Sequence, residues 1–533
     1  MIRFNQLLVL VLFLSLPSLC LAQAVNARTQ SISIALGAEP PDLNSMTSTD
    51  QSSIFILNHV MQGLLRYGKN GQLVGGVAEK WTLSNDEAVF WLRKNALWSD
   101  GRPVTAHDFV YAWRTVVHPK TASQYAFILY PLKNAEAINQ QGMPVEALGV
   151  VTEGDFILRI KLQRPCAYFL SLMAFVTYYP IREDFHQERS TRYAAEAEEM
   201  LFNGPFKLVK WVHGAELALV KNEFYWDRDN IRLQRIDVPF ITTDTGTTFN
   251  LFKDGEIAIA GLDVATISNA LENRLPIKKF NDGAVFYLEF NHRVGRLTRN
   301  KNLRKAIQSV FNANELVNKV IGVPGNRPGE SLFPVWLPGK EKTFRQEYPA
   351  RRINFDVERA KGYLEMAKKE LQLESIPPLY LLSGDSPGAT VQAEYMQEVL
   401  SRYLGLELKL DKQIFKQRLA KMTSGDFDMV AAGWGPDYND PMTFADLFAS
   451  WNENNRGRYA DKDYDRWVRV AQETSDVEVR MNAFGELQNR LIEDAVLIPQ
   501  YERGFVYVQN PRLKGVVRRI FGGDPSYYYS YVE

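Results

Sequence analysis

The stretch from residue 378 to 441 constrains the fold most, because it alternates short apolar runs with helical patterns. We expect strands at 378–382, 406–410 and 427–432, and helices at 390–404 and 414–422. Strands joined by single helices form a parallel sheet through right-handed crossovers. This part of the chain is therefore predicted to be an α/β domain.

A loop follows the last of these strands. Two glycines and two prolines fall within residues 431–441, so the backbone must turn there. In open α/β sheets, ligands bind at loops beyond the carboxyl ends of the strands. Trp434 and Asp437 are expected at such an edge, where a carboxylate beside an aromatic ring suits a small cation such as an amine. The alternative is that Asp437 caps a turn and Trp434 fills the core.

Nearer the amino terminus, alternating apolar residues predict a strand at 31–36, and a helical pattern covers 52–65. A second helix should begin after Thr105. This residue fits an N-cap, and Asp108 at the third helical position completes a pattern like a capping box.

The length and the charge balance limit the number of domains and the kinds of partner that we expect. A chain of 533 residues is too long for one ordinary core, so two or three domains are expected. Lys and Arg together number 62, as do Asp and Glu. This neutral balance gives no support to nucleic-acid binding.

The first residues have the pattern of a cleaved secretory signal. Arg3 precedes an apolar run at 7–14, and small residues flank Gln23, so Val25 is the expected mature start. The apolar run is too short for a membrane anchor. Cys20 raises a lipoprotein as an alternative, against which the bulky Leu19 argues.

The chain shows no motif for catalysis or for a cofactor. It contains neither a Gly-x-Ser-x-Gly elbow nor a His-Glu-x-x-His pattern. Its six histidines form no pair at helical spacing and no cluster with cysteine, so no metal site is expected. We therefore expect no catalytic residues, no metal and no cofactor.

Motifs spread along the chain resemble the family 5 extracellular solute-binding proteins, the peptide and nickel receptors of ABC importers. Within that family the chain is most similar to oligopeptide-binding proteins. The resemblance rests on Ala78–Trp81, 98–109, 121–126, Asn203–Phe206, 222–226, 253–257, 287–291 and 498–501.

The resemblance implies a two-lobed periplasmic binding protein of the α/β class, with a hinge between the lobes and an extra inserted domain. It implies a signal peptide at 1–24, lobe I at 25–60, 186–285 and 503–533, an inserted domain II at 61–185, and lobe III at 286–502 with the Asp437 loop.

The resemblance also implies the binding residues. Asp437 would bind the α-ammonium of a peptide, in agreement with the cost of enclosing an unpaired charge. The backbone of Gly433 and Gly435 would approach the ligand closely, and the Thr49–Gln51 segment would face them as a second strand. Aromatic residues are candidates for lining side-chain pockets, with core packing as the alternative: Trp434, Phe415, Tyr125, Tyr287 and Tyr501.

The chain departs from the enteric oligopeptide receptors at several positions. Gly435 and Ala284 stand where those proteins have paired cysteines. Ala431 replaces an arginine that can meet a peptide carboxylate, and the region around Ala389 lacks their histidine. Arg418, Lys421 or a bridging water are candidate replacements, so the preferred peptide length stays open.

The expected partners are a short peptide, an ABC permease and its ATPase subunits. The chain itself shows no Walker A loop and no transmembrane bundle, and we expect a monomer. One alternative is a receptor of the same fold for a murein peptide, an opine or a metal chelate. Others are a secreted hydrolase, with Asp437 and Asp440 imagined as an acid pair, and a chaperone-like binder of unfolded chains.

Overall fold

The computed structural model describes residues 23–533. The predicted signal peptide falls mostly on residues 1–22, outside the described residues. At the start of the described chain, Ala24 is buried and its N–H donates to the carbonyl of Gly255 at 2.7 Å. No helix within residues 23–533 is long and apolar enough to cross a bilayer.

The largest sheet in the described residues has seven strands. Its order is β12, β18, β13, β17, β15 and β16, and β14 pairs with β18. The bounds are Ile259–Gly261 (β12), Ile277–Phe290 (β13), Arg327–Pro328 (β14), Leu379–Gly384 (β15), Leu408–Gln413 (β16), Met429–Trp434 (β17) and Leu497–Gln509 (β18).

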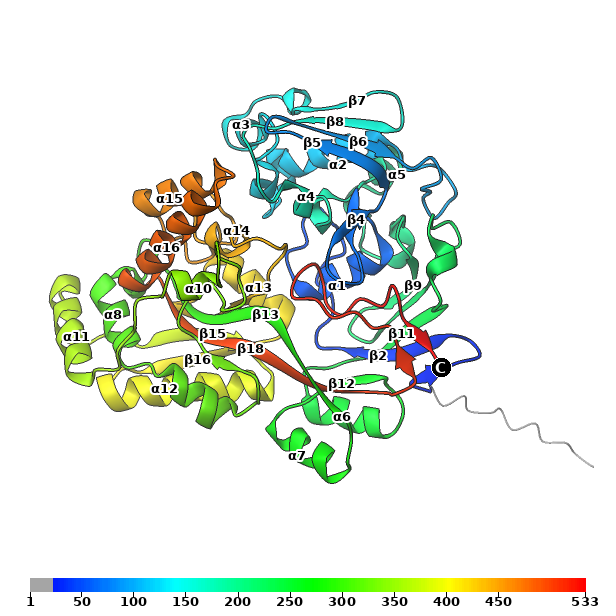
Figure 1. The fold of residues 1–533 in the computed structure, drawn as a ribbon. Coiled ribbons are helices and arrows are strands. Elements are labelled where there is room, and N and C mark those ends of the chain that lie inside the picture. The colour runs from blue at the N-terminus through cyan, green and yellow to red at the C-terminus, as the bar shows by residue number, and fades with distance from the viewer. Residues whose placement is uncertain (1–22) are drawn as a thin grey trace, which may run out of the picture.

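The alternating segment folds as predicted. Helix α12 (Pro387–Leu404) follows β15, and α13 (Phe415–Ser424) follows β16. Strand β15 is parallel to both β16 and β17. The sheet as a whole is mixed, because the long strand β13 runs antiparallel to β17 and β18. Helix α12 packs on this sheet at the left of Figure 1.

Strand β17 lies two residues further along the chain than the sequence pattern indicated, at Met429–Trp434 and not at 427–432. Gly433 and Trp434 pair with Phe286 and Val285 of β13, so they end the strand and do not open the loop. The turn begins at Gly435. The reason is a partner far along the chain, because β17 continues for as long as it pairs with the backbone of β13.

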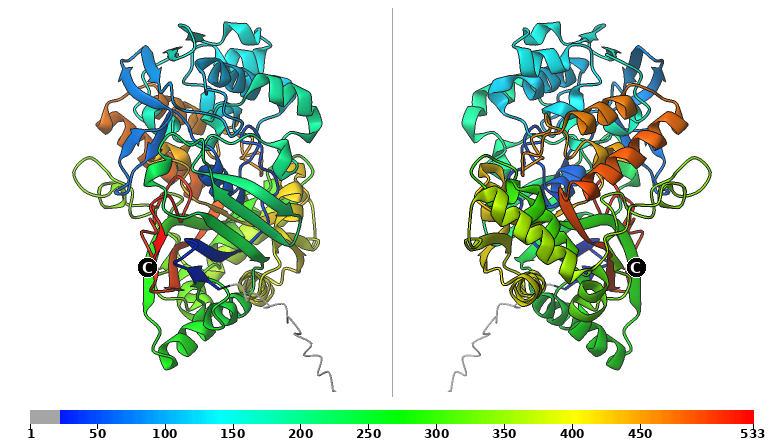
Figure 2. Two further views of the ribbon diagram at one scale, coloured as in Figure 1. Left: turned by 90° about the vertical axis from the view of Figure 1, so that its right-hand side faces the viewer. Right: turned by 90° about the vertical axis from the view of Figure 1, so that its left-hand side faces the viewer.

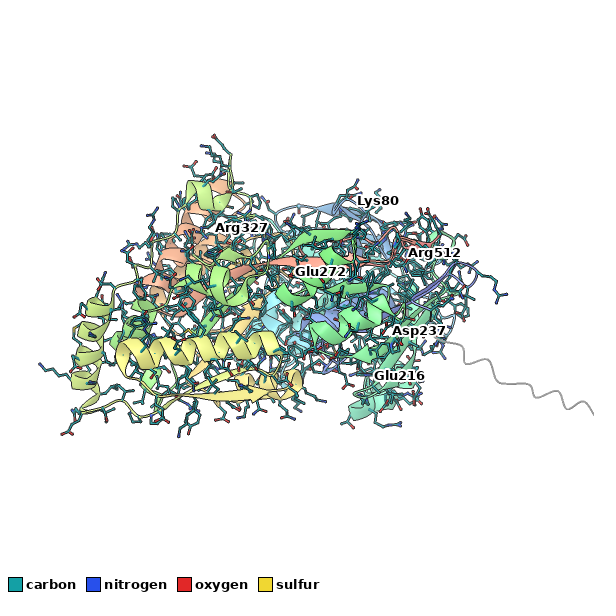
Figure 3. The ribbon with its side chains drawn as sticks, turned by 90° about the horizontal axis from the view of Figure 1, so that it is seen from below. Lys80, Glu216, Asp237, Glu272, Arg327 and Arg512 are labelled. Atoms are coloured by element: carbon teal, nitrogen blue, oxygen red, sulfur yellow. The ribbon has the colours of Figure 1, made fainter. Side chains whose placement is uncertain are left out.

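A second sheet has five strands in the order β1, β2, β11, β10 and β9. Strand β2 spans Ser31–Leu36, as predicted, and lies parallel to β11. The labelled Glu216 (on β10) and Asp237 (on β11) lie far from α12 in the view of Figure 3. The other bounds are Val25–Asn26 (β1), Phe206–Val212 (β9), Glu216–Lys221 (β10) and Arg235–Ile241 (β11).

A third, antiparallel sheet has the order β5, β6, β8 and β7 and forms the top of Figures 1 and 2 with helix α2 (Ala106–Val117). The Thr105 N–H donates to the Asp108 carboxylate at 2.8 Å, which confirms the predicted helix start. The strands span Ala78–Leu83 (β5), Glu87–Leu92 (β6), Val150–Thr152 (β7) and Ile157–Lys161 (β8).

Helix α1 is shorter than predicted: it spans Gln51–Val60 and does not reach residue 65. The Gln62 N–H instead donates to Asn203 Oδ1 at 2.9 Å. A Cβ on Gly63 would lie 2.5 Å from the carbonyl oxygen of Met173. Contacts with distant segments thus end this helix.

Strands β13 and β18 run side by side between the two ends of the large sheet (Figure 1). At its carboxyl end β18 pairs with β12, and Ala258, just before β12, donates its N–H to Ser33 of β2. These strands therefore connect the part containing α12 with the part containing β2. The division into lobes given above remains a proposal, with β13 and β18 as the connecting elements.

Candidate binding site

A cavity of about 720 Å³ lies where these parts meet. Helices α1 and α13 both contribute to its wall and face each other across the middle of Figure 1. All ten residues predicted to bind ligand line this cavity: Thr49, Gln51, Tyr125, Tyr287, Phe415, Gly433, Trp434, Gly435, Asp437 and Tyr501. The structure thus brings together residues from distant parts of the chain, and their role in ligand binding stays a prediction.

Asp437 is buried, with only 5 % of its surface exposed. Its Oδ2 accepts a hydrogen bond from the Tyr125 hydroxyl at 2.8 Å, and its N–H donates to Thr443 Oγ1 at 3.1 Å. Within residues 23–533 no basic side chain lies within ion-pair distance of its carboxylate. Burial raises its pKa to about 7. A cation placed here would relieve the desolvation of this carboxylate.

Asp440, and not Asp437, caps the turn in this loop. Asp440 Oδ1 accepts the Met442 N–H at 2.9 Å. The same carboxylate makes a two-pronged ion pair with Arg480 of α16 (Val477–Glu493), at 2.6 and 3.0 Å. Both side chains are buried. This pair anchors the loop that carries Asp437.

Two glycines keep the cavity open beside Trp434. A Cβ on Gly433 would lie 2.8 Å from the Phe286 ring, and one on Gly435 would lie 3.2 Å from Gln51 Nε2. Gly435 therefore lies against the segment predicted to face it. That segment is not a strand, since Asp50 caps α1 by accepting the Ser53 N–H and Gln51 is the first helical residue.

The aromatic residues of the wall also belong to the core. Tyr125, Tyr287 and Tyr501 are buried, and Tyr501 stacks on Phe286 with ring centroids 4.6 Å apart. Trp434 and Phe415 are only half-buried, and the Trp434 ring lies 6.4 Å from that of Tyr125. Trp434 and Phe415 thus have the most surface left for a ligand.

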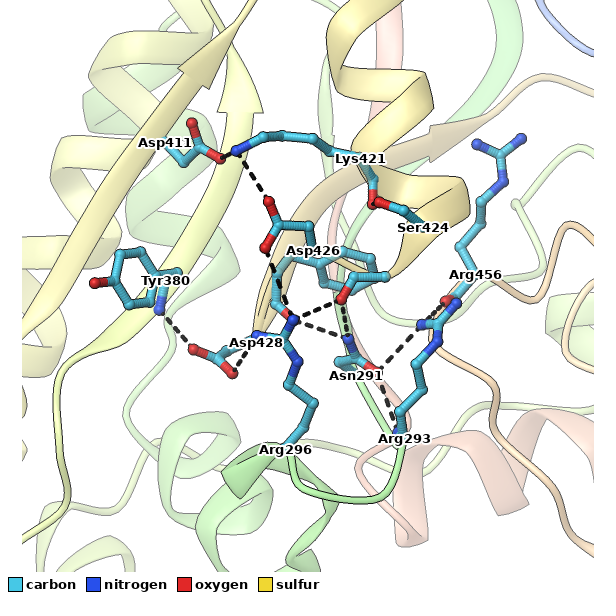
Figure 4. Close-up of polar contacts among 12 residues, drawn as sticks. Asn291, Arg293, Arg296, Tyr380, Asp411, Lys421, Ser424, Asp426, Asp428 and Arg456 are labelled. Carbon is cyan, nitrogen blue, oxygen red and sulfur yellow. Dashed lines mark hydrogen bonds and ion pairs between the residues drawn. The ribbon is translucent and has the colours of Figure 1, made fainter.

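The structure distinguishes between Arg418 and Lys421, the two candidates to replace the arginine that meets a peptide carboxylate. Lys421 forms ion pairs with Asp411 and Asp426 and does not line the cavity (Figure 4). Arg418 lines the cavity, where its Nη1 donates to the Ala431 carbonyl at 3.3 Å. Of the two, only Arg418 can meet a ligand.

Sequence reasoning missed several charged residues of the wall, among them Glu289 and Arg456. Glu289 is buried beside Tyr287, accepts the Gly457 N–H through Oε1, and has its pKa raised to about 7 by burial. Its place in the alternating pattern of 285–290 was an available signal, because a charge there falls on a buried face. Arg456 also lines the cavity, and nothing local in its loop pointed to it. Residues 23–533 contain no cluster of His, Cys, Asp and Glu suited to a metal ion.

The chain is similar to known binding proteins over most of its length. It is 30% identical to the dipeptide-binding protein DppE of Bacillus subtilis over 469 residues, covering 87% of this chain and 85% of the relative. A substrate-binding domain of an oligopeptide ABC transporter from Bacillus anthracis superposes with a TM-score of 0.90, at 33% identity, covering 95% of this chain and 99% of that one. Listeria monocytogenes OppA bound to peptide gives 0.88 at 31% identity, covering 94% and 99%.

The match to a family agrees with these relatives. The sequence model of the family described as bacterial extracellular solute-binding proteins, family 5, matches residues 72–456. This range covers well over half of the chain. The protein belongs to the family 5 bacterial extracellular solute-binding proteins.

Proposed function

We propose that this protein is the substrate-binding component of an ABC importer, which captures short peptides in the periplasm and delivers them to a membrane permease driven by ATPase subunits. The observation that carries the proposal is the buried Asp437, which has no cation within ion-pair distance in residues 23–533 and lines the cavity. The relatives named for dipeptide and oligopeptide binding support it.

Asp437 is the group proposed to bind the α-ammonium of the peptide. Every peptide with a free amino terminus carries this group, so a receptor that binds it accepts peptides of many sequences. In the enclosed site the ammonium would replace lost hydration with a charge-assisted hydrogen bond to the carboxylate. Tyr125, whose hydroxyl already donates to Oδ2, would hold the carboxylate in position.

The peptide backbone is proposed to lie along the edge formed by Gly433 and Gly435, with Thr49 and Gln51 on the facing wall. Residues without a Cβ allow a ligand chain to approach the main chain closely. Hydrogen bonds to backbone groups are independent of sequence, as in strand addition. The half-buried Trp434 and Phe415 would then contact ligand side chains.

The ligand can be identified by native mass spectrometry of the purified mature protein, followed by denaturing release of what it carries. We expect a ladder of short peptides with mixed sequences and a common length. A single murein peptide, opine or metal chelate would contradict the general peptide proposal. Cleavage of added peptides on long incubation would instead indicate a hydrolase, and affinity for whole denatured proteins would indicate a chaperone.

Peptide affinity is expected to depend on pH in a bell-shaped manner. Binding requires an ionised Asp437, whose pKa is about 7 without ligand, and a protonated α-ammonium, whose pKa is about 8. Affinity should fall about tenfold per pH unit below 7 and fall again above 8. Calorimetry of trialanine from pH 5 to 9 measures this, and an N-acetylated trialanine, which has no ammonium, is the control. A flat profile would contradict ammonium binding at Asp437.

Two finer features belong to this proposal. The chain would be secreted by cleavage before Val25, which amino-terminal sequencing of the periplasmic protein would detect. The lobes would close on the ligand by a hinge motion, with the ligand favouring the closed state. Small-angle scattering should then show a smaller radius of gyration, and a monomer, when peptide is added.

A further inference from the structure

Two parts of the chain contact each other although no segment joins them directly. Residues 61–185, which include the sheet of β5 to β8, connect at both ends to the part that contains β2. Residues 286–502 reach that part only through the connecting strands β13 and β18. A bend in these two strands would separate residues 61–185 from residues 286–502. The contacts between the two parts therefore belong to the closed form of the protein.

The first of these contacts is an ion pair between helices α3 (Ala135–Gln141) and α15 (Lys462–Gln472), of which α3 is the upper one in Figure 1. Arg469 on α15 donates both terminal nitrogens to the Glu136 carboxylate on α3, with Nη1 3.0 Å from Oε2. The central guanidinium carbon also lies 4.0 Å from the centroid of the Trp451 ring. Trp451 and Arg469 belong to the same part, so the ring orients the arginine for this two-pronged bond.

The second contact is a pair of stacked rings. Tyr168 lies on Tyr438 with ring centroids 5.3 Å apart and an angle of 8° between the planes, and both side chains are buried. The Arg480 guanidinium lies 5.7 Å from the centroid of the Tyr168 ring. Tyr438 follows Asp437 directly in the sequence. The stack thus connects residues 61–185 to the loop that carries the candidate ammonium site.

Both contacts lie outside the cavity. None of the four residues Glu136, Arg469, Tyr168 and Tyr438 belongs to its wall. A ligand in the cavity therefore gains no direct contact with them. What they change is the free energy of the closed form relative to an open form in which the two parts are separated.

We propose that the Glu136–Arg469 ion pair and the Tyr168–Tyr438 stack together form a closure interface, which strengthens the binding of every peptide by the same factor. This inference rests on the proposed peptide function and deepens it. The apparent dissociation constant of a ligand is its constant for the closed protein divided by the fraction of protein that is closed. Contacts that raise this fraction raise the affinity for all peptides alike, so a receptor can bind tightly without selecting a sequence.

The chemistry of the interface also allows the protein to reopen. The side chains of Glu136 and Arg469 are 33 % and 27 % exposed, so water can replace their bond when the parts separate. A partly exposed ion pair stabilises a structure only modestly. The buried tyrosine stack adds apolar contact area. The ion pair therefore adjusts the closed fraction without locking the ligand in.

Calorimetry with three peptides of different sequence, Ala-Ala-Ala, Ala-Lys-Ala and Ala-Glu-Ala, tests the proposal. Arg469→Met and Glu136→Gln should each weaken the binding of all three by the same factor, about two- to fivefold. The double variant should be no weaker than the single variants, because either change already removes the pair. Arg466→Met is the matched control on α15. Its partner Asp463 lies on the same helix, so affinity should stay unchanged.

The thiol of Cys166 provides a second measurement that needs no ligand. Cys166 is the only cysteine in residues 23–533 and is buried two residues before Tyr168. Burial raises the pKa of this thiol to about 12, and the charges of Asp440 and Arg480 from the other part act on it. Separation of the parts should expose it. Without peptide, dithionitrobenzoate should therefore label Arg469→Met at least twofold faster than the unaltered protein.

Saturating trialanine should slow the labelling of both proteins to the same low rate. Faster labelling of the variant with peptide bound would indicate local loosening and would overturn the proposal. Tyr168→Leu should also weaken all three peptides equally. If this variant fails to fold, the ion-pair variants decide the question, because their side chains are partly exposed.

Three further results would overturn the closure interface while leaving peptide binding in place. These are unchanged affinity in both ion-pair variants, a loss that differs more than threefold between the peptides, and equal labelling of Arg469→Met and the unaltered protein without ligand. Failure of all three peptides to bind the unaltered protein would instead contradict the proposed peptide function. The labelling rates without ligand would then still decide whether the ion pair holds the two parts together.

Discussion

Replacing Asp437 with asparagine is expected to weaken peptide binding by a factor of hundreds or more. Removing one partner of a buried ion pair typically costs about 3 to 5 kcal/mol, because the other charge is left desolvated and unpaired. Here the unpaired charge would be the ligand ammonium. Calorimetry with trialanine measures the loss, and Asn is chosen because it keeps the shape and an acceptor for Tyr125.

The same substitution should stabilise the ligand-free protein at neutral pH. The pKa of Asp437 is raised from its usual 3.8 to about 7, so the folded state holds its proton more tightly than the unfolded state. The contribution of this carboxyl to the free energy of unfolding is fully present below pH 4. It is lost as the pH rises to 7, at about 1.4 kcal/mol for each unit of pKa shift. Asparagine does not ionise, so the Asp437→Asn variant does not lose this stability as the pH rises.

Thermal unfolding of the two ligand-free proteins at pH 4.5 and pH 8 tests this second effect. The variant should have the higher midpoint at pH 8 and nearly the same midpoint at pH 4.5. Tyr125→Phe is the matched control, because it removes the hydroxyl and keeps the carboxylate. Peptide affinity that survives Asp437→Asn within a factor of ten would exclude Asp437 as the ammonium site.

Replacing Arg480 with methionine is expected to produce the largest loss of stability among single changes near the site, about 3 to 5 kcal/mol. Asp440 would stay buried without its two-pronged partner. The Arg480 Nε bond to the Ala471 carbonyl would be lost as well. Urea denaturation measures the change in free energy of unfolding.

Two further variants isolate the role of the pair. Arg480→Met combined with Asp440→Asn removes both charges and retains an acceptor for the Met442 N–H, so most of the stability should return. Arg466→Met breaks an exposed pair with Asp463 and should cost less than about 1 kcal/mol. A loss below 1 kcal/mol for Arg480→Met would show that Asp440 is not held by this pair.

The Asp440–Arg480 pair also affects ligand binding, because it holds the loop that carries Asp437. Asp440 and Asp437 belong to the same short turn, and Arg480 holds it from α16. We therefore expect Arg480→Met to lower peptide affinity as well, even though Arg480 does not line the cavity.

The elements that were predicted well are those with strong local signals. The strand at 31–36, the alternating segment and the capped start of α2 depend on periodicity and on contacts within a few residues. The elements that were predicted poorly depend on partners far along the chain. Helix α1 ends at Val60 because Asn203 accepts the Gln62 N–H.

The candidate site divides in the same way. The sequence alone indicated Asp437, the glycines and the aromatic residues, because their motif and family resemblance are carried by neighbouring residues. It left Arg418 and Lys421 as equal candidates and did not suggest Arg456 or Glu289. Only the tertiary structure decided among these, since burial, ion pairing and access to the cavity arise from segments separated by hundreds of residues.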